Sequence, residues 1–398
     1  MVVGVTDPCC ICHDRQMTRG SVILELTEEQ AFFGATTRKF LESEVPLSKV
    51  RELYESAEGF DREWWRQTAE LGWTSFFVPE SLGGGSVSGR PTTDAAIVAQ
   101  EIGRLVSPGP FLPVNVVAAA LAWAGSGDQQ ASLLPGLLSG EAMAAWALCE
   151  PRGRWDASSV AVTATPTDDG IVLEGVKAYV EAAALADHFL VTARTDDGLS
   201  QLLVPAAAPG VKVTPGRSID MTRRFGTVTF DGVRLPTSAA IGPLGEADAS
   251  VERLIGLAIA LQCAEMVGIA DRVLEFTVDY GRERIAFGRP IVSFQALKHR
   301  IADMTVWLEG SKAVCEALAD AIDGNRQDGG RLANVAKAYI GERCLDIVDD
   351  CVQITGGIGV TWEHDLHLYN RRAAVDRAVY GTPEEHKERL FALLDNQE

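Results

Sequence analysis

The stretch RERIAFGRPIVSFQALKHRIADM, residues 282–304, decides how the C-terminal half of the chain folds. Pro290 lies between two segments with helical spacing, and proline cannot continue a helix interior. The sequence therefore predicts a long helix that ends near Gly281, a break, and a second long helix that begins at a serine cap, Ser293. The same stretch gathers five basic side chains in a chain whose formal net charge is −19: Arg282, Arg284, Arg289, Lys298 and Arg300.

The spacing of apolar residues changes twice along the chain. It is helical from Thr27 to about Leu138, and Thr27 with Gln30 three residues later predicts a capping box. The period is two from about Ala144 to Ala240, and then becomes helical again. The middle region includes two strands expected around Asp168-Asp169-Gly170. We predict an α+β protein with these parts: residues 1–25, a disordered leader; 26–143, helical; 144–243, β-structure; and 244–398, helical.

Composition restricts the possible functions. The 398 residues are 46% hydrophobic, enough for a large core. The pI of about 4.8 argues against a nucleic-acid surface, which needs clustered basic charge. The longest apolar run, VNVVAAALAWAG, is about half of a membrane span, so we expect no span. With no secretory signal at the N-terminus, we expect a cytoplasmic protein.

The eight cysteines are scattered, which indicates reduced thiols rather than a disulfide framework. One cluster, CCICH at Cys9, Cys10, Cys12 and His13, could be interpreted as a metal site. Its spacing is tighter than C-x-x-C and no second ligand pair follows, so we expect no metal.

The glycine motifs do not predict a Rossmann site, because GGIG follows a helix rather than a strand. A different arrangement is predicted at the helix ends. Cations, amides and bare backbone brought together there suit a pyrophosphate and its ribose. The alternative is a solvated arginine face at a helix corner. The residues concerned are Arg284, Phe287, Gln295, Gln353, Gly356 and Gly357.

Two stretches resemble the acyl-CoA dehydrogenase family. The first, residues 284–295, matches the family pattern Arg-x-x-Phe-Gly-x-Pro-Ile-x-x-Phe-Gln, and the second, QITGGIG, matches Gln-x-x-Gly-Gly-x-Gly. LGWTSFFVPESLGGG, LEGVKAYV and VTFDGVRLP extend the resemblance over most of the chain. It implies a helical N-terminal domain, a middle β-sandwich or barrel, and a C-terminal four-helix bundle. It also implies an FAD enzyme, usually a dimer of dimers, that removes an α-proton and a β-hydride from an acyl-CoA thioester.

The resemblance also assigns roles to residues. It implies that Arg284, Phe287, Gln295, Gln353, Gly356 and Gly357 hold the adenine and pyrophosphate end of an FAD bound in a neighbouring subunit. The usual catalytic glutamate is replaced by Tyr380, whose phenol is a poor base at neutral pH. The alternative base position on the long helix is Ala258. Glu265 on that helix lies about 10 Å from Ala258 along the axis, so we interpret it as an interior or interface residue.

The positions expected to face the flavin ring also depart from the family. Cys149 replaces a threonine, Trp155 falls near a serine position, and Tyr179-Val180-Glu181 replaces Trp-x-Thr. An ionised carboxylate cannot donate the hydrogen bond that a hydroxyl would give. No catalytic residue is therefore assigned in this chain.

These departures resemble the base-free subunit of bacterial heterotetramers in the family. The resemblance implies a related partner subunit that carries the glutamate, FAD, an acyl-CoA substrate, and electron-transfer flavoprotein or a similar acceptor. A bulky substrate such as a steroid side-chain thioester is compatible with it. The alternatives are a self-sufficient homomeric dehydrogenase with an unidentified base, or a flavin-free binding or scaffold protein on the same fold.

Overall fold

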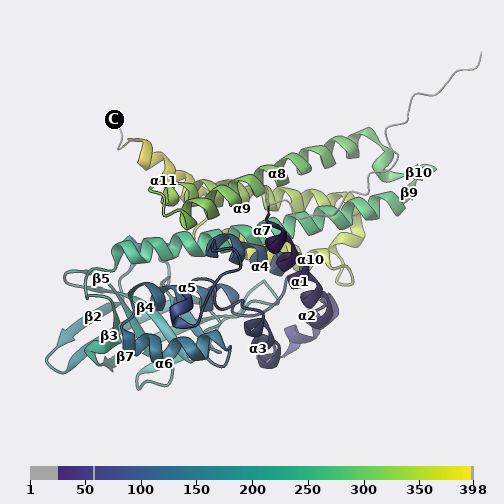
Figure 1. Ribbon diagram of the computed structural model, residues 1–398. Helices are drawn as coiled ribbons and strands as arrows, with labels where there is room; N and C mark the ends of the chain where they lie inside the picture. Colours follow the sequence, from purple (N-terminus) through teal and green to yellow (C-terminus); the bar gives the residue numbers. More distant parts are fainter. Residues whose placement is uncertain (1–25, 57–58, 396–398) are drawn as a thin grey trace, which may run out of the picture.

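The computed structural model describes residues 26–56 and 59–395, and along the chain a β-sheet region separates two sets of helices. In space the strands gather at one end of the molecule, at the lower left of Figure 1, below the bundle of the later helices. The helices before the sheet are α1 (Glu28–Glu44), α2 (Leu47–Glu55), α3 (Arg62–Glu70), α4 (Pro91–Leu105), α5 (Phe111–Ala124) and α6 (Gly127–Leu138). The helices after it are α7 (Asp248–Glu283), α8 (Gln295–Asp323), α9 (Gly329–Thr355), α10 (Leu366–Ala378) and α11 (Pro383–Asp395). The expected order of a helical region, a β-region and a second helical region is confirmed.

The middle region is an eight-stranded sheet within the described residues, ordered β6-β7-β3-β2-β4-β5-β8, with β1 paired to β4. Its strands are β1 (Ala144–Ala147), β2 (Thr163–Thr167), β3 (Gly170–Glu181), β4 (His188–Thr195), β5 (Gly198–Pro205), β6 (Val211–Pro215), β7 (Phe225–Leu235) and β8 (Ala240–Ile241). Side chains alternate between two cores, because successive strand residues face opposite sides. On β4, Phe189 and Val191 enter the core of the sheet, whereas Leu190 joins the core of the helices.

The helices before and after the sheet share one continuous core, centred on α7. Two glycines allow α4 and α7 to cross closely. A Cβ at Gly103 would lie 2.0 Å from the carbonyl oxygen of Glu265, and one at Gly268 would lie 1.9 Å from that of Gln100. Only glycine fits at such a backbone approach, so this crossing fixes the position of the middle of α7.

Local sequence signals account for several element boundaries. The predicted capping box at Thr27 and Gln30 is present. The two strands around Asp168-Asp169-Gly170 form a hairpin in which Thr167 pairs with Gly170. The prediction of Ser293 as a helix cap is wrong. Its hydroxyl donates to the carbonyl of Pro290 (2.6 Å), and α8 begins one residue later than predicted, with Phe294 as its N-cap and no side-chain cap.

One helix among residues 26–56 and 59–395, α7, is long and apolar enough to cross a membrane, so the expectation that no run reaches this length was too strict. Its most apolar window is 89% buried inside the protein, as in a core helix of a globular domain. The leader and its cysteine cluster lie outside the described residues, and the domain boundaries remain predictions. Within the described part of the chain, no group of three or more His, Cys, Asp or Glu side chains could hold a metal ion.

Candidate functional site

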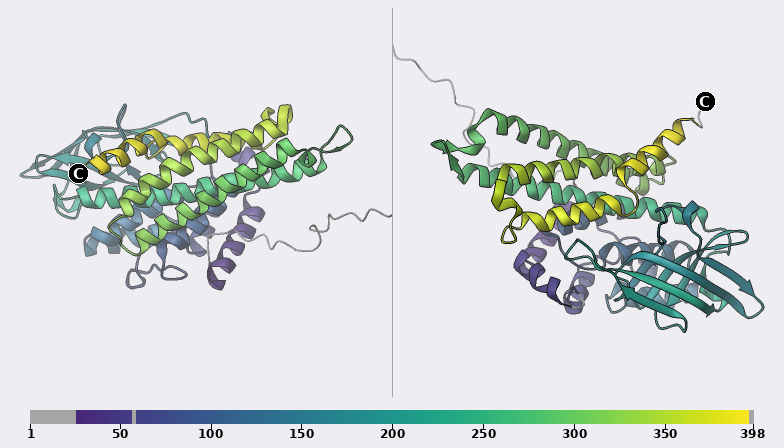
Figure 2. Two further views of the ribbon diagram at one scale, coloured as in Figure 1. Left: turned by 90° about the horizontal axis from the view of Figure 1, so that it is seen from above. Right: turned by 180° about the vertical axis from the view of Figure 1, so that it is seen from behind.

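The predicted pyrophosphate-binding residues lie at one end of the helical bundle, away from the sheet (Figures 1 and 2). We call this group the basic corner; it comprises Arg284, Phe287, Gln295, Gln353, Gly356 and Gly357, and all six are exposed. The start of α8 and the end of α9 meet there, as the ion pair between Arg300 and Asp350 shows. Arg300 lies between one and two helical turns from Gln295 on α8, and Asp350 lies about one turn from Gln353 on α9.

A short hairpin carries the aromatic part of the basic corner. Arg284 ends α7, and its carbonyl accepts a hydrogen bond from the Ile291 N–H (2.9 Å) across the hairpin of β9 (Ile285–Ala286) and β10 (Arg289–Pro290). Phe287 at the tip is 96% exposed, which is unusual for so large an apolar side chain. Its position indicates a ring available to another molecule.

The glycines of the basic corner leave bare backbone on the surface. Gly356 follows α9 with a φ of 71°, a conformation that favours glycine. A Cβ at Gly356 or Gly357 would meet nothing within 4 Å, so the space beside both residues is open. The N–H of Gly356 already donates to the carbonyl of Val352, so Gly357 is the glycine whose exposed backbone is suited to a phosphate group, as Arg284 is by its charge.

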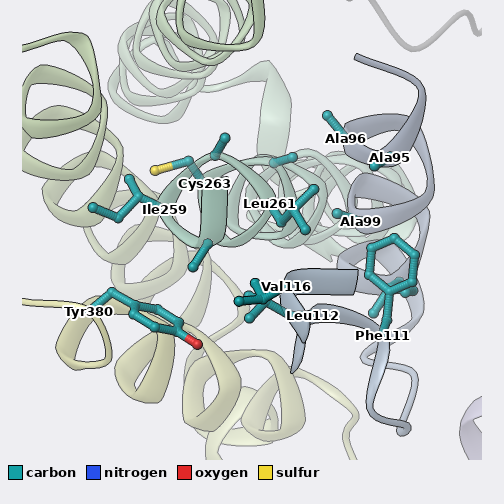
Figure 3. Close-up of a cluster of buried hydrophobic side chains, with 14 of the residues drawn as sticks. Ala95, Ala96, Ala99, Phe111, Leu112, Val116, Ile259, Leu261, Cys263 and Tyr380 are labelled. Carbon is teal, nitrogen blue, oxygen red and sulfur yellow. The ribbon is translucent and has the colours of Figure 1, made fainter. Parts of the chain in front are cut away.

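The two base positions lie at the other end of α7, inside the protein. Ala258 is fully buried, and Tyr380 is 5% exposed with a φ of 61°. Figure 3 shows Tyr380 on the same side of α7 as Leu112 and Val116 of α5. Burial raises the pKa of Tyr380 far above its usual value, so the phenol stays protonated and cannot act as a base.

Tyr380 belongs to a group of four rings that we call the aromatic cluster. Its ring centroid lies 4.9 Å from that of Trp155 and 6.2 Å from that of Trp146, which it stacks against. Tyr179 adds a fourth ring, exposed at the surface and 6.5 Å from Trp155. Contacts at these distances are typical of favourable aromatic packing. Tyr179 and Tyr380 are therefore linked through Trp155, and all three are positions that depart from the family pattern.

Glu181, another position that departs from the family pattern, belongs to a buried ion-pair network. Its carboxylate lies 3.4 Å from the guanidinium of Arg223, and its second oxygen, Oε2, has no hydrogen-bond partner among the described residues. Burial raises the pKa of Glu181, although Arg223 acts in the opposite direction. The network comprises Glu181, Asp220, Arg223, Glu265, Arg372 and Asp376, each at most 8% exposed.

Two guanidinium groups hold the ion-pair network together. Arg223 also pairs with Glu265 and with Asp376 (2.7 Å), and Arg372 pairs with Glu265 and Asp220. Glu265 is thus an interior residue, as interpreted from the sequence. Burial raises the pKa of Asp376 well above its usual value despite Arg223. Buried charges without such pairing are costly, so the network is a structural requirement of this interior.

Sequence reasoning missed this network except for Glu265 and Glu181. The sequence did contain one indication: some charged residues, such as Arg372 on α10, occupy helix positions whose spacing is that of the buried apolar residues. Their partners are distant in the sequence: Arg372 and Asp220 are 152 residues apart. No local pattern joins such pairs.

Comparisons with known proteins agree with this architecture. The chain matches three family models: Acyl-CoA dehydrogenase, N-terminal domain (27–141), middle domain (145–233) and C-terminal domain (250–392). It is 32% identical over 364 residues to acyl-CoA dehydrogenase IpdE2 of Mycobacterium tuberculosis, covering 91% of this chain and 96% of that protein. The chain belongs to the acyl-CoA dehydrogenase family.

Two solved structures of acyl-CoA dehydrogenases are similar along nearly the whole chain. A variant of the Tcur3481–Tcur3483 steroid ACAD has a TM-score of 0.83 and 29% identity, covering 93% of this chain and 98% of that one. The ChsE4–ChsE5 complex from Mycobacterium tuberculosis has a TM-score of 0.83 and 28% identity, with the same coverage. Members of this acyl-CoA dehydrogenase family are FAD-dependent oxidoreductases.

The basic corner of this acyl-CoA dehydrogenase has groups that suit a flavin diphosphate, and the interior beside Glu181 and Tyr380 is closely packed. The ring centroids of Trp155 and Tyr380 lie 4.9 Å apart, so no planar group stands between these two rings. The cavity beside Glu181 and Arg223 has a volume of about 20 Å³, enough for one water molecule. A second cavity, beside Glu265 and Arg372, is about 10 Å³. These two cavities are therefore too small for a flavin ring.

Proposed function

We propose that this chain is the base-free subunit of a heteromeric acyl-CoA dehydrogenase and completes the FAD site of a catalytic partner. The observation that carries the proposal is the distance between the basic corner and the predicted base position at Ala258. Arg284 follows Ala258 by 26 residues along α7, which corresponds to about 39 Å at 1.5 Å per residue. One dinucleotide cannot contact both ends, so the basic corner serves an FAD bound in another chain.

In such a complex, FAD would accept the two electrons released when an acyl-CoA thioester is dehydrogenated between its α- and β-carbons. This chain would bind and orient the cofactor. Arg284 would neutralise diphosphate charge, Phe287 would offer an apolar ring, and the amide of Gly357 would donate to an anionic oxygen. The α-proton would be removed by a carboxylate of the partner, because this chain carries none at Tyr380 or Ala258.

The relatives support the choice of complex and substrate class. Both solved structures named above are described with two protein names, and one is described as a steroid ACAD. We therefore favour a bulky thioester such as a steroid side chain, oxidised in a heterotetramer that passes electrons to electron-transfer flavoprotein or a similar acceptor. These assignments rest on similarity and on the absence of a carboxylate at Tyr380 and Ala258.

The test is co-expression with a related chain that has glutamate at either base position, followed by counting FAD per chain. One FAD for every two chains, bleached by acyl-CoA under anaerobic conditions, supports the proposal. A homo-oligomer with one FAD per chain would instead indicate a self-sufficient enzyme. A complex that stays colourless when FAD is added would indicate a flavin-free scaffold.

Arg284→Ala in that complex should weaken FAD retention, and Arg282→Ala provides the matched control. Arg282 lies on the last turn of α7 and is already paired with Asp279 (2.9 Å), so its loss should not affect FAD. Equal FAD retention in the two variants would contradict the assignment of the basic corner.

A further inference from the structure

The tip of the β9–β10 hairpin holds its aromatic ring in a strained conformation. Phe287 has a φ of 51° and Gly288 a φ of 79°, so both central residues of the turn are left-handed. Turns of this kind strongly prefer asparagine or aspartate followed by glycine. Phenylalanine in the first position costs free energy, and at 96% exposure its ring gains little from burial in this chain.

A second ring supports Phe287 from the start of α8. The rings of Phe287 and Phe294 meet edge to face, with centroids 6.2 Å apart and planes at 85°. Phe294 is the N-cap of α8, and its backbone N–H donates to the carbonyl of Ile291 (3.2 Å). The backbone of Phe294 is therefore anchored to a long helix, whereas Phe287 stands on a two-residue turn.

A guanidinium lies over Phe294 as well. The Cζ atom of Arg289 is 4.0 Å from the centroid of the Phe294 ring, well within the range of a cation–π contact. Its position on β10 places it opposite Ala286 in the hairpin. No carboxylate forms an ion pair with Arg289 in the described part of the chain, unlike Arg282 and Arg300, which pair with Asp279 and Asp350.

We propose that Arg289 is a positioning residue of the basic corner. Stacked on Phe294, it fixes the ring against which Phe287 rests, and so sets the direction in which Phe287 is presented to an FAD held by the partner. The inference rests on the proposed function and deepens it, because it distinguishes a residue that organises the corner from one that neutralises the diphosphate.

The test is a double-mutant cycle on the reconstituted complex, with the dissociation constant of FAD measured by flavin fluorescence. Arg289→Ala should weaken FAD binding by about two- to fivefold, the range that an exposed cation–π contact corresponds to. In a Phe294→Ala background the same change should have no further effect, because the ring through which Arg289 acts is absent. Arg289→Lys, which keeps the charge but loses the planar stack, should recover only part of the affinity.

Two results would overturn this inference. An unchanged dissociation constant in Arg289→Ala would show that the stack is irrelevant, and an equal loss with and without Phe294 would show that Arg289 acts as a charge on the cofactor. Failure of the proposed function would look different. In that case Arg284→Ala would also leave the dissociation constant unchanged, as Arg282→Ala is expected to do.

Discussion

Replacing Gly268 by alanine would place a methyl group 1.9 Å from the backbone carbonyl oxygen of Gln100, where α4 crosses α7. A carbon and an oxygen that are not bonded need more than 3 Å between them, so the helices would have to separate by more than 1 Å. Overpacking of this kind typically costs about 1–3 kcal/mol, and alanine returns at most about 1 kcal/mol through its better helix propensity. Because the obstacle is backbone rather than a flexible side chain, we expect the upper part of that range.

Gly256→Ala is the matched control, because it lies on the same helix and its Cβ would meet nothing within 4 Å. There, alanine should leave the free energy of unfolding unchanged or raise it by up to about 1 kcal/mol. Urea unfolding of the two purified variants, followed by tryptophan fluorescence, measures the difference. If Gly268→Ala proved as stable as Gly256→Ala, the close crossing of α4 and α7 would be wrong.

Three further variants probe the interior. Arg372→Met removes the cation from two buried ion pairs and should lower the free energy of unfolding, measured by urea titration, by about 3–5 kcal/mol. The control Arg282→Met, at an exposed position, should change it by less than about 0.5 kcal/mol. Since the pKa of Glu181 is raised, its contribution to stability is present below the unfolded pKa of 4.5 and is lost as pH rises through the folded pKa. The stability of the wild type relative to Glu181→Gln should therefore fall as pH rises above 4.5. Ala258→Glu should destabilise the complex without increasing turnover per FAD, because it buries a carboxylate in a fully buried position; an increase would show that a thioester reaches this interior.

Elements with local signals could be predicted from the sequence. The Thr27 cap, the hairpin around Gly170 and the end of α9 at Gly356 each depend on residues a few positions apart. Ser293 shows the limit of such reasoning. A serine before a helical pattern favours a cap, but the 3₁₀ turn after Pro290 takes up its hydroxyl, and the helix begins after Phe294.

The interior could be predicted only in part. Departures from the family pattern identified Tyr380, Trp155 and Glu181 as unusual, and no sequence pattern could show that two of them pack together while the third pairs with Arg223. Arg223 and Asp376, 153 residues apart, come together only because the β6–β7 loop packs against α10. Such contacts depend on the tertiary fold rather than on local spacing.

The packed interior and the open corner are connected through α7. This long helix presents Arg284 at one end, while its middle is held in the core of the protein. Voids and unpaired buried charges are both costly. Here, aromatic rings pack around Tyr380, and Arg223 and Arg372 balance carboxylates that would otherwise be buried alone. The packing that avoids these costs therefore also holds the middle of α7, from whose far end the basic corner projects.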